Sequence, residues 1–444
     1  MPVLAEADVL VCGGGCAGVV AAIAAARRGC RVVLLERWTG VGGMLTNALV
    51  TIWHRSDRRR VVINGLVEEM TQRALRHGWA RPVGDFPRRH ETHWLNPEGL
   101  RLLLQRMLDE AGVRTICHLV AGQPILEGGR LRGVLCDTKR GRRAVLGRIA
   151  IDATGDGDIA AACGVPFTYG RESDGRAQGM TMMFELCGID TAALRAAPVE
   201  VRQAVIDHMR TERDAGRFPP FNEGGVVGQF LKGWASNHAP WNLCPVAGDG
   251  LDEEELTRLT HRAREQVARY LECWRERLPG MAAARLSQTA YALGVRETRH
   301  VRGRVTLTAS MVLAAAKQPD AVGHGVWMID VHDPLGTGYT TYTDRDARSM
   351  LAEGTSYHIP LGMALNVHVP NLAVACRAAD ATHEAHASFR VQTHLMALAQ
   401  GVGTCAALAM QSGCDLAEVP VASVQHALRD DGVHLEDVPA PGGA

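Results

Sequence analysis

Two polar residues beside an apolar run have the types and spacing of an acid–base pair. Asp330 and His332 lie in Ile329-Asp330-Val331-His332-Asp333, which has the pattern of a strand end. Side chains two positions apart on a strand point to the same side. An imidazole titrates near neutral pH, and an adjacent carboxylate fixes its tautomer and stabilises its protonated form. His332 is therefore a candidate base, and Asp330 is either its orienting partner or the reacting group.

Other cationic and basic side chains could bind or transform an acidic substrate. Arg296 and Arg299 could grip a carboxylate through paired N–H groups, or could form structural ion pairs with Glu297 or another acid. The chain has 18 histidines, so each one also has a structural interpretation, and His383 is a second candidate base. Further candidates for a polar pocket are Glu384, His386, Arg390, Tyr339, Tyr342 and Tyr357. The spacing of His and Cys matches no zinc site, so we expect no metal.

A glycine-rich turn near the N-terminus has the chemistry of a phosphate site. Gly13, Gly15 and Gly18 form G-x-G-x-x-G between an apolar run at 8–12 and an alanine-rich helix at 19–28. One glycine makes the tight turn, one admits a pyrophosphate and one lets the helix pack on the strand. The helix N-terminus offers free N–H groups to the phosphates. The pattern predicts a dinucleotide site, and a coincidental tight turn is the alternative.

The acid at the end of the second strand refines this site. Residues 31–35 are an apolar strand that closes on Glu36, which could accept hydrogen bonds from an adenosine ribose and would repel a 2′-phosphate. Gly401 and Gly403 lie inside a helix, where they indicate close packing. No second strand-linked fingerprint follows, which argues against a dedicated nicotinamide domain.

Several further elements are legible from local patterns. Asn96-Pro97-Glu98 caps an amphipathic helix that Gly112 ends, and a strand at 113–120 follows. The remaining expected elements are a short helix at 65–77, paired strands at 131–137 and 144–153, a helix at 159–163, a long helix at 253–277, a strand at 371–376, a polar turn at 377–390 and a helix at 391–410. Small and acidic residues at 152–158 could lie against a flat or phosphorylated ligand, or merely cap the helix at 159–163.

Composition indicates an ordinary soluble protein. The 444 residues carry a formal net charge of zero and are 46% hydrophobic, so neither nucleic acid nor a membrane is an expected partner. Twelve cysteines occur without a C-x-x-C pair, and several lie in apolar runs. The first strand begins by residue 8 without a secretory signal before it. We expect a reduced, cytoplasmic protein.

These motifs together resemble the FAD-dependent oxidoreductase family with the glutathione-reductase-like FAD-binding fold. The match extends over most of the chain and is weak at about 200–290. The segments that carry it, besides the fingerprint and Glu36, are Gly42 to Thr46, Ile151 to Asp158, Met180 to Phe184, Arg296 to Arg299, Ile329 to Pro334 and Asn371 to Ala407. Cys376, before an arginine, stands where this family suggests glycine, and Cys16 stands where proline or a small residue is usual.

The resemblance implies that the dinucleotide is FAD. It assigns the cofactor to Gly13, Gly15, Cys16, Ala17, Gly18, Glu36, Arg37, Gly43, Met44, Leu45, Thr154, Gly155, Asp380 and Val391. Asp380 would lie near the pyrophosphate or the ribityl chain. The helix from Val391 would aim its N-terminus at the flavin pyrimidine ring, where reduced flavin carries negative charge. Cys376 is a candidate for a covalent flavin thioether.

The implied architecture is α/β: a Rossmann-like FAD-binding domain with an inserted α+β substrate domain. The expected segments are 1–53, 96–185 and 355–430 for the FAD-binding domain, 54–95 for a polar excursion, 186–354 for the substrate domain and 431–444 for a tail. The resemblance implies an FAD-dependent enzyme that dehydrogenates or oxidises a small polar metabolite by hydride transfer to flavin N5. The candidate catalytic residues are His332, Asp330, His383, Arg390 and Arg296. The alternatives are a flavin monooxygenase and a non-catalytic flavin-binding module. The substrate, the electron acceptor and the oligomeric state, with a homo-oligomer one option, are left open.

Overall fold

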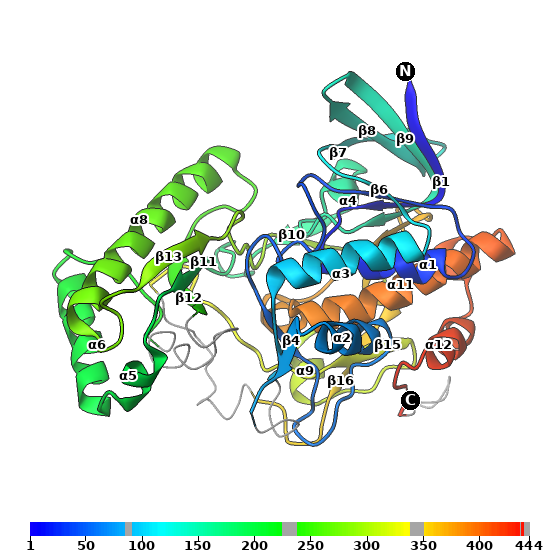
Figure 1. Ribbon diagram of the computed structural model, residues 1–444. Helices are drawn as coiled ribbons and strands as arrows, with labels where there is room; N and C mark the ends of the chain where they lie inside the picture. Colours follow the sequence, from blue (N-terminus) through cyan, green and yellow to red (C-terminus); the bar gives the residue numbers. More distant parts are fainter. Residues whose placement is uncertain (85–90, 224–237, 338–349, 436, 439–444) are drawn as a thin grey trace.

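The larger of two lobes is built on a parallel sheet. The computed structural model describes residues 1–84, 91–223, 238–337, 350–435 and 437–438, and it places the two lobes side by side (Figure 1). The parallel strands, in spatial order, are β6 (Arg114–Ile116), β2 (Val32–Leu35), β1 (Val3–Cys12), β9 (Gly141–Asp152) and β17 (Leu372–Val374). The buried residues of β1, β2, β9 and β17 are mostly valine, leucine, isoleucine or alanine, as expected for parallel strands covered on both faces. The fold is therefore mixed α/β with a Rossmann-like core.

Helices from opposite ends of the chain cover one face of this sheet. Figure 1 shows α1 (Cys16–Ala26), α3 (Pro97–Glu110) and α11 (Gln392–Ser412) side by side. The predicted cap of α3 is confirmed, because the Asn96 side chain accepts a hydrogen bond from the Gly99 N–H at 2.9 Å. Close packing at Gly403 is also confirmed, since a Cβ there would lie 2.3 Å from the Ala21 carbonyl oxygen.

Helix α11 is the one helix of the described chain with the length and apolar composition to cross a membrane. Of its most apolar 18-residue window, 89% is buried inside the protein. Packing against α1 and the sheet accounts for this composition.

An antiparallel hairpin extends β9 beyond the parallel sheet. β7 (Val120–Glu127) and β8 (Arg130–Thr138) pair with each other, and β8 pairs with β9, as the sequence predicted for 131–137 and 144–153. The strand predicted at 113–120 is instead two strands, β6 and β7, on different parts of the sheet. His118 between them has a φ of 64°, and this left-handed residue redirects the chain.

The segment predicted as a polar excursion has a structure of its own. It contains α2 (Leu66–Arg76), which confirms the short helix predicted at 65–77, and the strands β4 (Ala80–Pro82) and β5 (Glu91–Leu95). β5 pairs antiparallel with β4 and with β3 (Ile52–His54), which ends where the segment begins. The side chain of Arg55 is 1% exposed: it donates to the Ile63 carbonyl and to Thr71 Oγ1 at 2.9 Å each, and pairs with Glu68. The polar composition of this segment suggested exposed side chains, but the guanidinium of Arg55 is buried because buried partners satisfy its hydrogen bonds.

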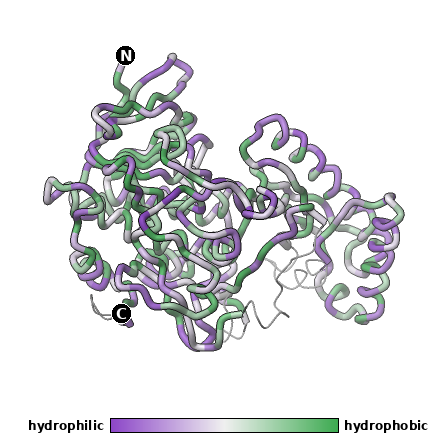
Figure 2. Tube along the Cα trace, turned by 180° about the vertical axis from the view of Figure 1, so that it is seen from behind, coloured by the Kyte–Doolittle hydropathy of each residue, from purple (hydrophilic) through white to green (hydrophobic). Residues whose placement is uncertain are grey.

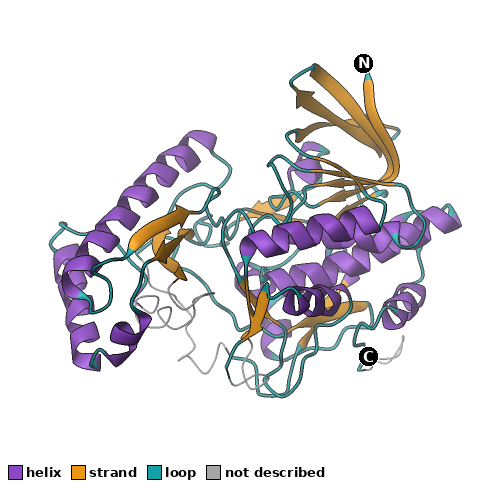
Figure 3. Cartoon of the chain, in the orientation of Figure 1, coloured by secondary structure: helices purple, strands orange, loops and turns teal. Residues whose placement is uncertain are grey.

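The smaller lobe has a separate hydrophobic core. Its three-stranded antiparallel sheet comprises β12 (His238–Val246), β11 (Met180–Cys187) and β13 (Arg285–Thr289), and its helices are α5 (Thr191–Ala196), α6 (Val199–Asp214) and α8 (Glu253–Arg277). Phe184, Trp241, Tyr270 and Trp274 pack together between α8 and the sheet. Figure 3 shows the strands of this lobe beside the long helix α8. Figure 2 shows hydrophilic and hydrophobic stretches alternating along the chain of this lobe.

The boundaries of this second core differ from the predicted substrate domain at 186–354. Its buried residues, among those described, run from Met180 to Leu293, with Leu49 added, whereas buried residues such as Val301, Ile329 and Leu351 belong to the core of the larger lobe. The other elements are α4 (Asp158–Ala162), β10 (Phe167–Tyr169), β14 (Arg299–Val301), α9 (Ala309–Leu313), β15 (Ala321–Gly325), β16 (Tyr357–Pro360), α10 (His383–Phe389), α12 (Val421–Asp430) and two short 3-10 turns at Leu361–Met363 and Leu416–Glu418.

Helix α10 corrects the predicted polar turn at 377–390. The side chain of Thr382 caps it, a local signal that the polar composition obscured.

Candidate active site

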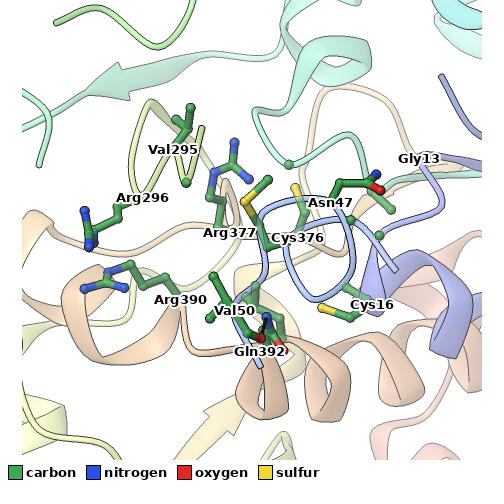
Figure 4. A pocket seen from close by; sticks show the side chains of 18 of the residues that line it. Gly13, Cys16, Asn47, Val50, Val295, Arg296, Cys376, Arg377, Arg390 and Gln392 are labelled. Carbon is green, nitrogen blue, oxygen red and sulfur yellow. Dashed lines mark hydrogen bonds between the residues drawn. The ribbon is translucent and has the colours of Figure 1, made fainter. Parts of the chain in front are cut away.

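A cavity of about 360 Å³ connects the carboxyl end of the parallel sheet with the second lobe. One end is lined by the glycine turn after β1, and the other by residues from the loops at 294–296 and 327–332. Ligands of open α/β sheets bind outside the carboxyl ends of the strands. Figure 4 shows Gly13 and Cys16 on one side of this space and Arg296 and Arg390 on the other.

The three fingerprint glycines have different physical roles. Gly13 has a φ of +111°, and a Cβ there would lie 2.2 Å from the Ala153 carbonyl oxygen. A Cβ on Gly18 would lie 1.9 Å from the Gly13 carbonyl oxygen, so Gly18 serves helix packing and does not line the cavity. A Cβ on Gly15 would meet no protein atom within 4 Å. A side chain at Gly15 would therefore project into the cavity without a clash against protein atoms.

The start of α1 supplies unsatisfied N–H groups to the same region. Its N-cap, Gly15, has no side chain to cap the first turn, and no acidic residue lies there. Cys16 and Ala17 also line the cavity. Free N–H groups and the positive end of the helix dipole favour an anion such as a pyrophosphate.

Glu36 closes this end of the cavity. One carboxylate oxygen accepts from the Gly14 N–H at 2.7 Å and the other from the Trp38 N–H at 2.8 Å. These bonds fix the carboxylate beside the glycine turn, and its remaining lone pairs are available to ribose hydroxyls. Arg37 lines the same end of the cavity.

Two loops complete the wall next to the glycine turn. A Cβ on Gly43 would lie 2.8 Å from the Gly15 Cα, so the two loops touch through backbone alone. Of the residues assigned to the cofactor, Met44, Thr154 and Gly155 line the cavity, whereas Leu45 is fully buried and does not. Val391, at the N-cap of α11, also lines the cavity and has no side-chain cap to offer.

The opposite end of the cavity brings four predicted catalytic residues together. His332 Nε2 lies 3.2 Å from Asp330 Oδ2, and Arg390 Nη2 donates to the Asp330 carbonyl oxygen at 3.0 Å. Arg296 Nη1 donates to the Gly179 carbonyl oxygen at 2.5 Å. All four residues line the cavity. Figure 4 shows both guanidinium groups pointing the same way, to one side of this space.

The electrostatics of this end favour a neutral imidazole beside an ionised carboxylate. Burial, and then the charge of Arg296, lower the pKa of His332 to about 4. Burial acts to raise the pKa of Asp330, but His332, Arg390 and Arg296 together hold it well below its ordinary value. Burial and the charge of Arg390 lower the pKa of Arg296 to about 9, so it stays protonated at neutral pH. Two guanidinium charges against one carboxylate leave this end of the cavity positive.

Besides Gly18 and Leu45, two more predicted site residues, His383 and Asp380, lie outside the cavity, and these are corrections. His383 Nδ1 lies 2.8 Å from Glu297 Oε1 in a buried network that also contains His300. Asp380 Oδ2 accepts from the Gly303 N–H at 2.8 Å and from Thr306 Oγ1 at 3.0 Å. Both side chains are engaged outside the cavity: the His383 imidazole pairs with the Glu297 carboxylate, whereas Asp380 accepts from the Gly303 N–H and the Thr306 hydroxyl.

Two of the remaining polar candidates, Tyr357 and Arg299, do not line the cavity. The hydroxyl of Tyr357 lies 2.9 Å from Ser388 Oγ, and the residue is fully buried away from the cavity. Arg299 pairs with Asp158 at 2.8 Å, the structural alternative considered for it. Tyr339 and Tyr342 lie outside the described residues.

The sequence interpretation did not assign Arg377 to the site, although it lines the cavity. Its Nη2 atom lies 2.5 Å from Asp156 Oδ1, and a Cβ on Gly155 would lie 2.6 Å from its Nη1 atom. Its position directly after Cys376, at the end of a buried strand, was the available signal. An aromatic stretch of the wall was also missed, formed by His54, Trp94 and Trp327.

Comparison with known proteins decides the family. The model of the family described as FAD dependent oxidoreductase matches residues 8–428. The chain belongs to the FAD-dependent oxidoreductase family. It is therefore an enzyme, and its cofactor is FAD.

Solved structures with similar arrangements are distant in sequence. A geranylgeranyl bacteriochlorophyll reductase-like protein from Thermoplasma acidophilum is 12% identical, with 96% of this chain and 82% of that chain covered at a TM-score of 0.45. The myxobacterial chondrochloren halogenase CndH is 14% identical, with 96% and 78% covered at 0.45. The p-nitrophenol 4-monooxygenase PnpA from Pseudomonas putida DLL-E4 is 11% identical, with 97% and 85% covered at 0.43.

Proposed function

We propose that this member of the FAD-dependent oxidoreductase family oxidises a small anionic metabolite by hydride transfer to the flavin. The observation that carries the proposal is the placement of the His332–Asp330 pair, Arg296 and Arg390 on the same cavity as the glycine fingerprint. An imidazole oriented by a carboxylate suits removal of a proton from a hydroxyl or an amine.

The residues around the cavity fit FAD. The open space at Gly15, the uncapped start of α1 and the carboxylate of Glu36 suit a pyrophosphate and a ribose, respectively. We assign the ADP half to these residues with Gly13, Arg37, Thr154 and Gly155, and the flavin half to Gly43, Met44 and Val391. When bound, FAD supplies the hydride acceptor at flavin N5.

The protein's own contribution is a base, its partner and a positive binding site. Because Asp330 is ionised, it accepts a hydrogen bond from His332 Nε2–H, which leaves the lone pair on Nδ1 to take the substrate proton. Asp330 then stabilises the imidazolium. Arg296 and Arg390 would bind an anionic group of the substrate and hold the reacting carbon in place.

The proposal also covers the type of FAD domain, the role of the smaller lobe, the cellular location and the partners. We infer that the parallel sheet belongs to a glutathione-reductase-like FAD domain, and that the smaller lobe acts as the substrate domain. All twelve cysteines are free, which supports a reducing cytoplasmic location. The partners we propose are a small-molecule substrate, an electron acceptor of undetermined kind and, as an option, a second copy of the chain.

The test is anaerobic mixing of the FAD-loaded enzyme with a panel of reductants. The panel pairs 2-hydroxy and 2-amino carboxylates with their neutral amides, and includes NADH and NADPH. The proposal expects a carboxylate to bleach the flavin in a saturable reaction, with slow reduction by its amide and by both nicotinamides. Fast saturable reduction by NADPH alone would contradict this proposal and favour the alternative, a flavin monooxygenase.

A further inference from the structure

Three histidines and an aspartate that do not line the FAD cavity gather where the C-terminal segment meets a strand pair. His324 of β15 and His358 of β16 are direct cross-strand partners, and their ring centroids are 4.9 Å apart. His434, which follows α12, stacks on His324 with centroids 5.1 Å apart. Asp437 Oδ1 lies 3.5 Å from His324 Nε2 and 3.0 Å from His358 Nε2. This group is named the C-terminal histidine cluster below.

We propose that the C-terminal histidine cluster binds a divalent first-row transition metal, with Zn²⁺ the best match. The ligands are His324, His434 and Asp437, whose donor atoms lie within 4.8 Å of one another. Imidazole and carboxylate are the non-sulfur ligands of protein zinc sites. Bond lengths of about 2.1 Å in a tetrahedral site put neighbouring donors roughly 3.4 Å apart, which the separation of 3.5 Å between His324 Nε2 and Asp437 Oδ1 already matches.

Outer contacts orient these ligands as they do in established zinc sites. His324 Nδ1 lies 2.9 Å from Ser356 Oγ, so its other ring nitrogen is left to face the cluster. The Gln318 N–H donates to His358 Nδ1 at 3.0 Å, so His358 carries its proton on Nε2 and donates it to Asp437. Hydrogen bonds of this kind fix the orientation of metal ligands.

Lys317 and a backbone carbonyl define the competing arrangement without metal. Lys317 Nζ pairs with Asp437 Oδ2 at 2.6 Å, on the carboxylate oxygen away from the histidines. His324 Nε2 lies 3.1 Å from the His434 carbonyl oxygen, to which it could simply donate. A metal shares the carboxylate with the Lys317 ammonium, so removal of that positive charge should tighten zinc binding.

The metal would act on stability, because the cluster joins the C-terminal segment to the core. β15 packs directly on α11, since a Cβ on Gly323 would lie 2.7 Å from the Ala397 Cβ. The sequence prediction of no metal relied on local spacing, but His324 and His434 are 110 positions apart. Only the fold brings these ligands together.

The test is zinc binding by the untagged, FAD-loaded protein after dialysis against a chelator. Competition with a chromophoric chelator measures stoichiometry and affinity, and thermal unfolding is followed with Zn²⁺ and with EDTA. We expect one zinc per chain and a higher unfolding temperature with zinc. His434→Ala and Asp437→Asn should each weaken binding at least 10–100-fold, the range for loss of an outer contact alone. Lys317→Met should strengthen it.

His426→Ala is the matched control, because this α12 histidine has an 80% exposed side chain and lies outside the cluster. It should leave zinc binding unchanged. The metal site is refuted if the wild type binds no zinc at 100 µM, or if His434→Ala and Asp437→Asn bind it as tightly as His426→Ala. His434 and Asp437 are both partly exposed, so these variants avoid a cavity in the core.

Discussion

His332 and Asp330 form a hydrogen-bonded pair, with Nε2 and Oδ2 separated by 3.2 Å, on the wall of the FAD cavity. With Nε2 held by the carboxylate, Nδ1 is the basic atom. His332→Ala should keep FAD and fold but slow substrate-driven flavin reduction by about 10²–10⁴. Stopped-flow bleaching with matched FAD content measures this, with His368→Ala, an exposed histidine, as control. Equal rates in both variants would exclude His332 as the base.

The pH dependence of flavin reduction should reveal the environment of His332. Its pKa is lowered to about 4 by burial and by Arg296. The base is neutral and active above its pKa, so the rate at low substrate concentration should stay level from pH 8 down to about 5. It should then fall roughly tenfold per unit below pH 4. A loss of rate centred near pH 6.5, the ordinary value for histidine, would contradict the assignment.

Removal of either guanidinium should weaken binding of an anionic substrate more than it slows the chemical step. Arg296→Gln and Arg390→Gln each delete charge-assisted hydrogen bonds worth about 1.5–3 kcal/mol, roughly a tenfold to hundredfold rise in dissociation constant. Concentration series of flavin bleaching separate the two effects. Arg269→Gln, on the exposed side of α8, serves as control. Unchanged affinity in both site variants would place the anion elsewhere or make the substrate neutral.

Gly15→Val should remove FAD without unfolding the protein. Gly15 has φ −64° and ψ 176°, which valine adopts, and its Cβ would meet no protein atom within 4 Å. The branched side chain would instead enter the cavity and cost at least about 1–3 kcal/mol of cofactor binding. Flavin absorbance and the thermal unfolding of the apoprotein are the two measurements. Gly84→Val, at an exposed glycine with equally open surroundings, should retain FAD. Full FAD occupancy in Gly15→Val would show that the fingerprint does not bind the pyrophosphate.

FAD should be released by acid, in spite of the two cysteines on the cavity wall. Burial raises the pKa of Cys376 to about 12, and that of Cys16 to about 12 as well. A flavin thioether requires a thiolate, which these environments disfavour. After acid precipitation the yellow colour should therefore stay in the supernatant. Colour in the pellet that disappears in Cys376→Ser would restore the covalent alternative.

The sequence predicted those parts of the fold that depend on local chemistry. The glycine turn between β1 and α1, the Asn96 cap of α3 and the β8–β9 hairpin each follow from neighbouring residues. Strands β3, β4 and β5 were not predicted, because each is only three to five residues long, and β3 pairs with β5 across the intervening helix α2. Such short strands carry too few residues to show a period of two.

The candidate site was predicted where its residues are near neighbours in the sequence, and missed where it depends on tertiary contacts. Residues 329–333 form no strand in the structure, so the strand expected there was wrong, although the same-side rule did bring Asp330 and His332 together. It gave no information on His383, whose direction is set by the buried carboxylate of Glu297. Arg377 entered the cavity wall because Asp156, more than two hundred positions earlier, holds its guanidinium. Contacts across that separation leave no local pattern in a sequence.

The contact between α1 and α11 governs the order in which a newly synthesised chain becomes able to load its cofactor. The helix that begins at the phosphate turn packs its Ala21 carbonyl against Gly403, and β17 reaches the sheet only at residue 372. A ribosome has therefore translated past residue 372 before the cofactor cavity acquires its last wall. Premature termination before α11 yields a polypeptide that contains the whole glycine fingerprint and still exposes the apolar back of α1. Quality-control proteases would meet such a fragment as an unfolded substrate, without bound flavin to protect it.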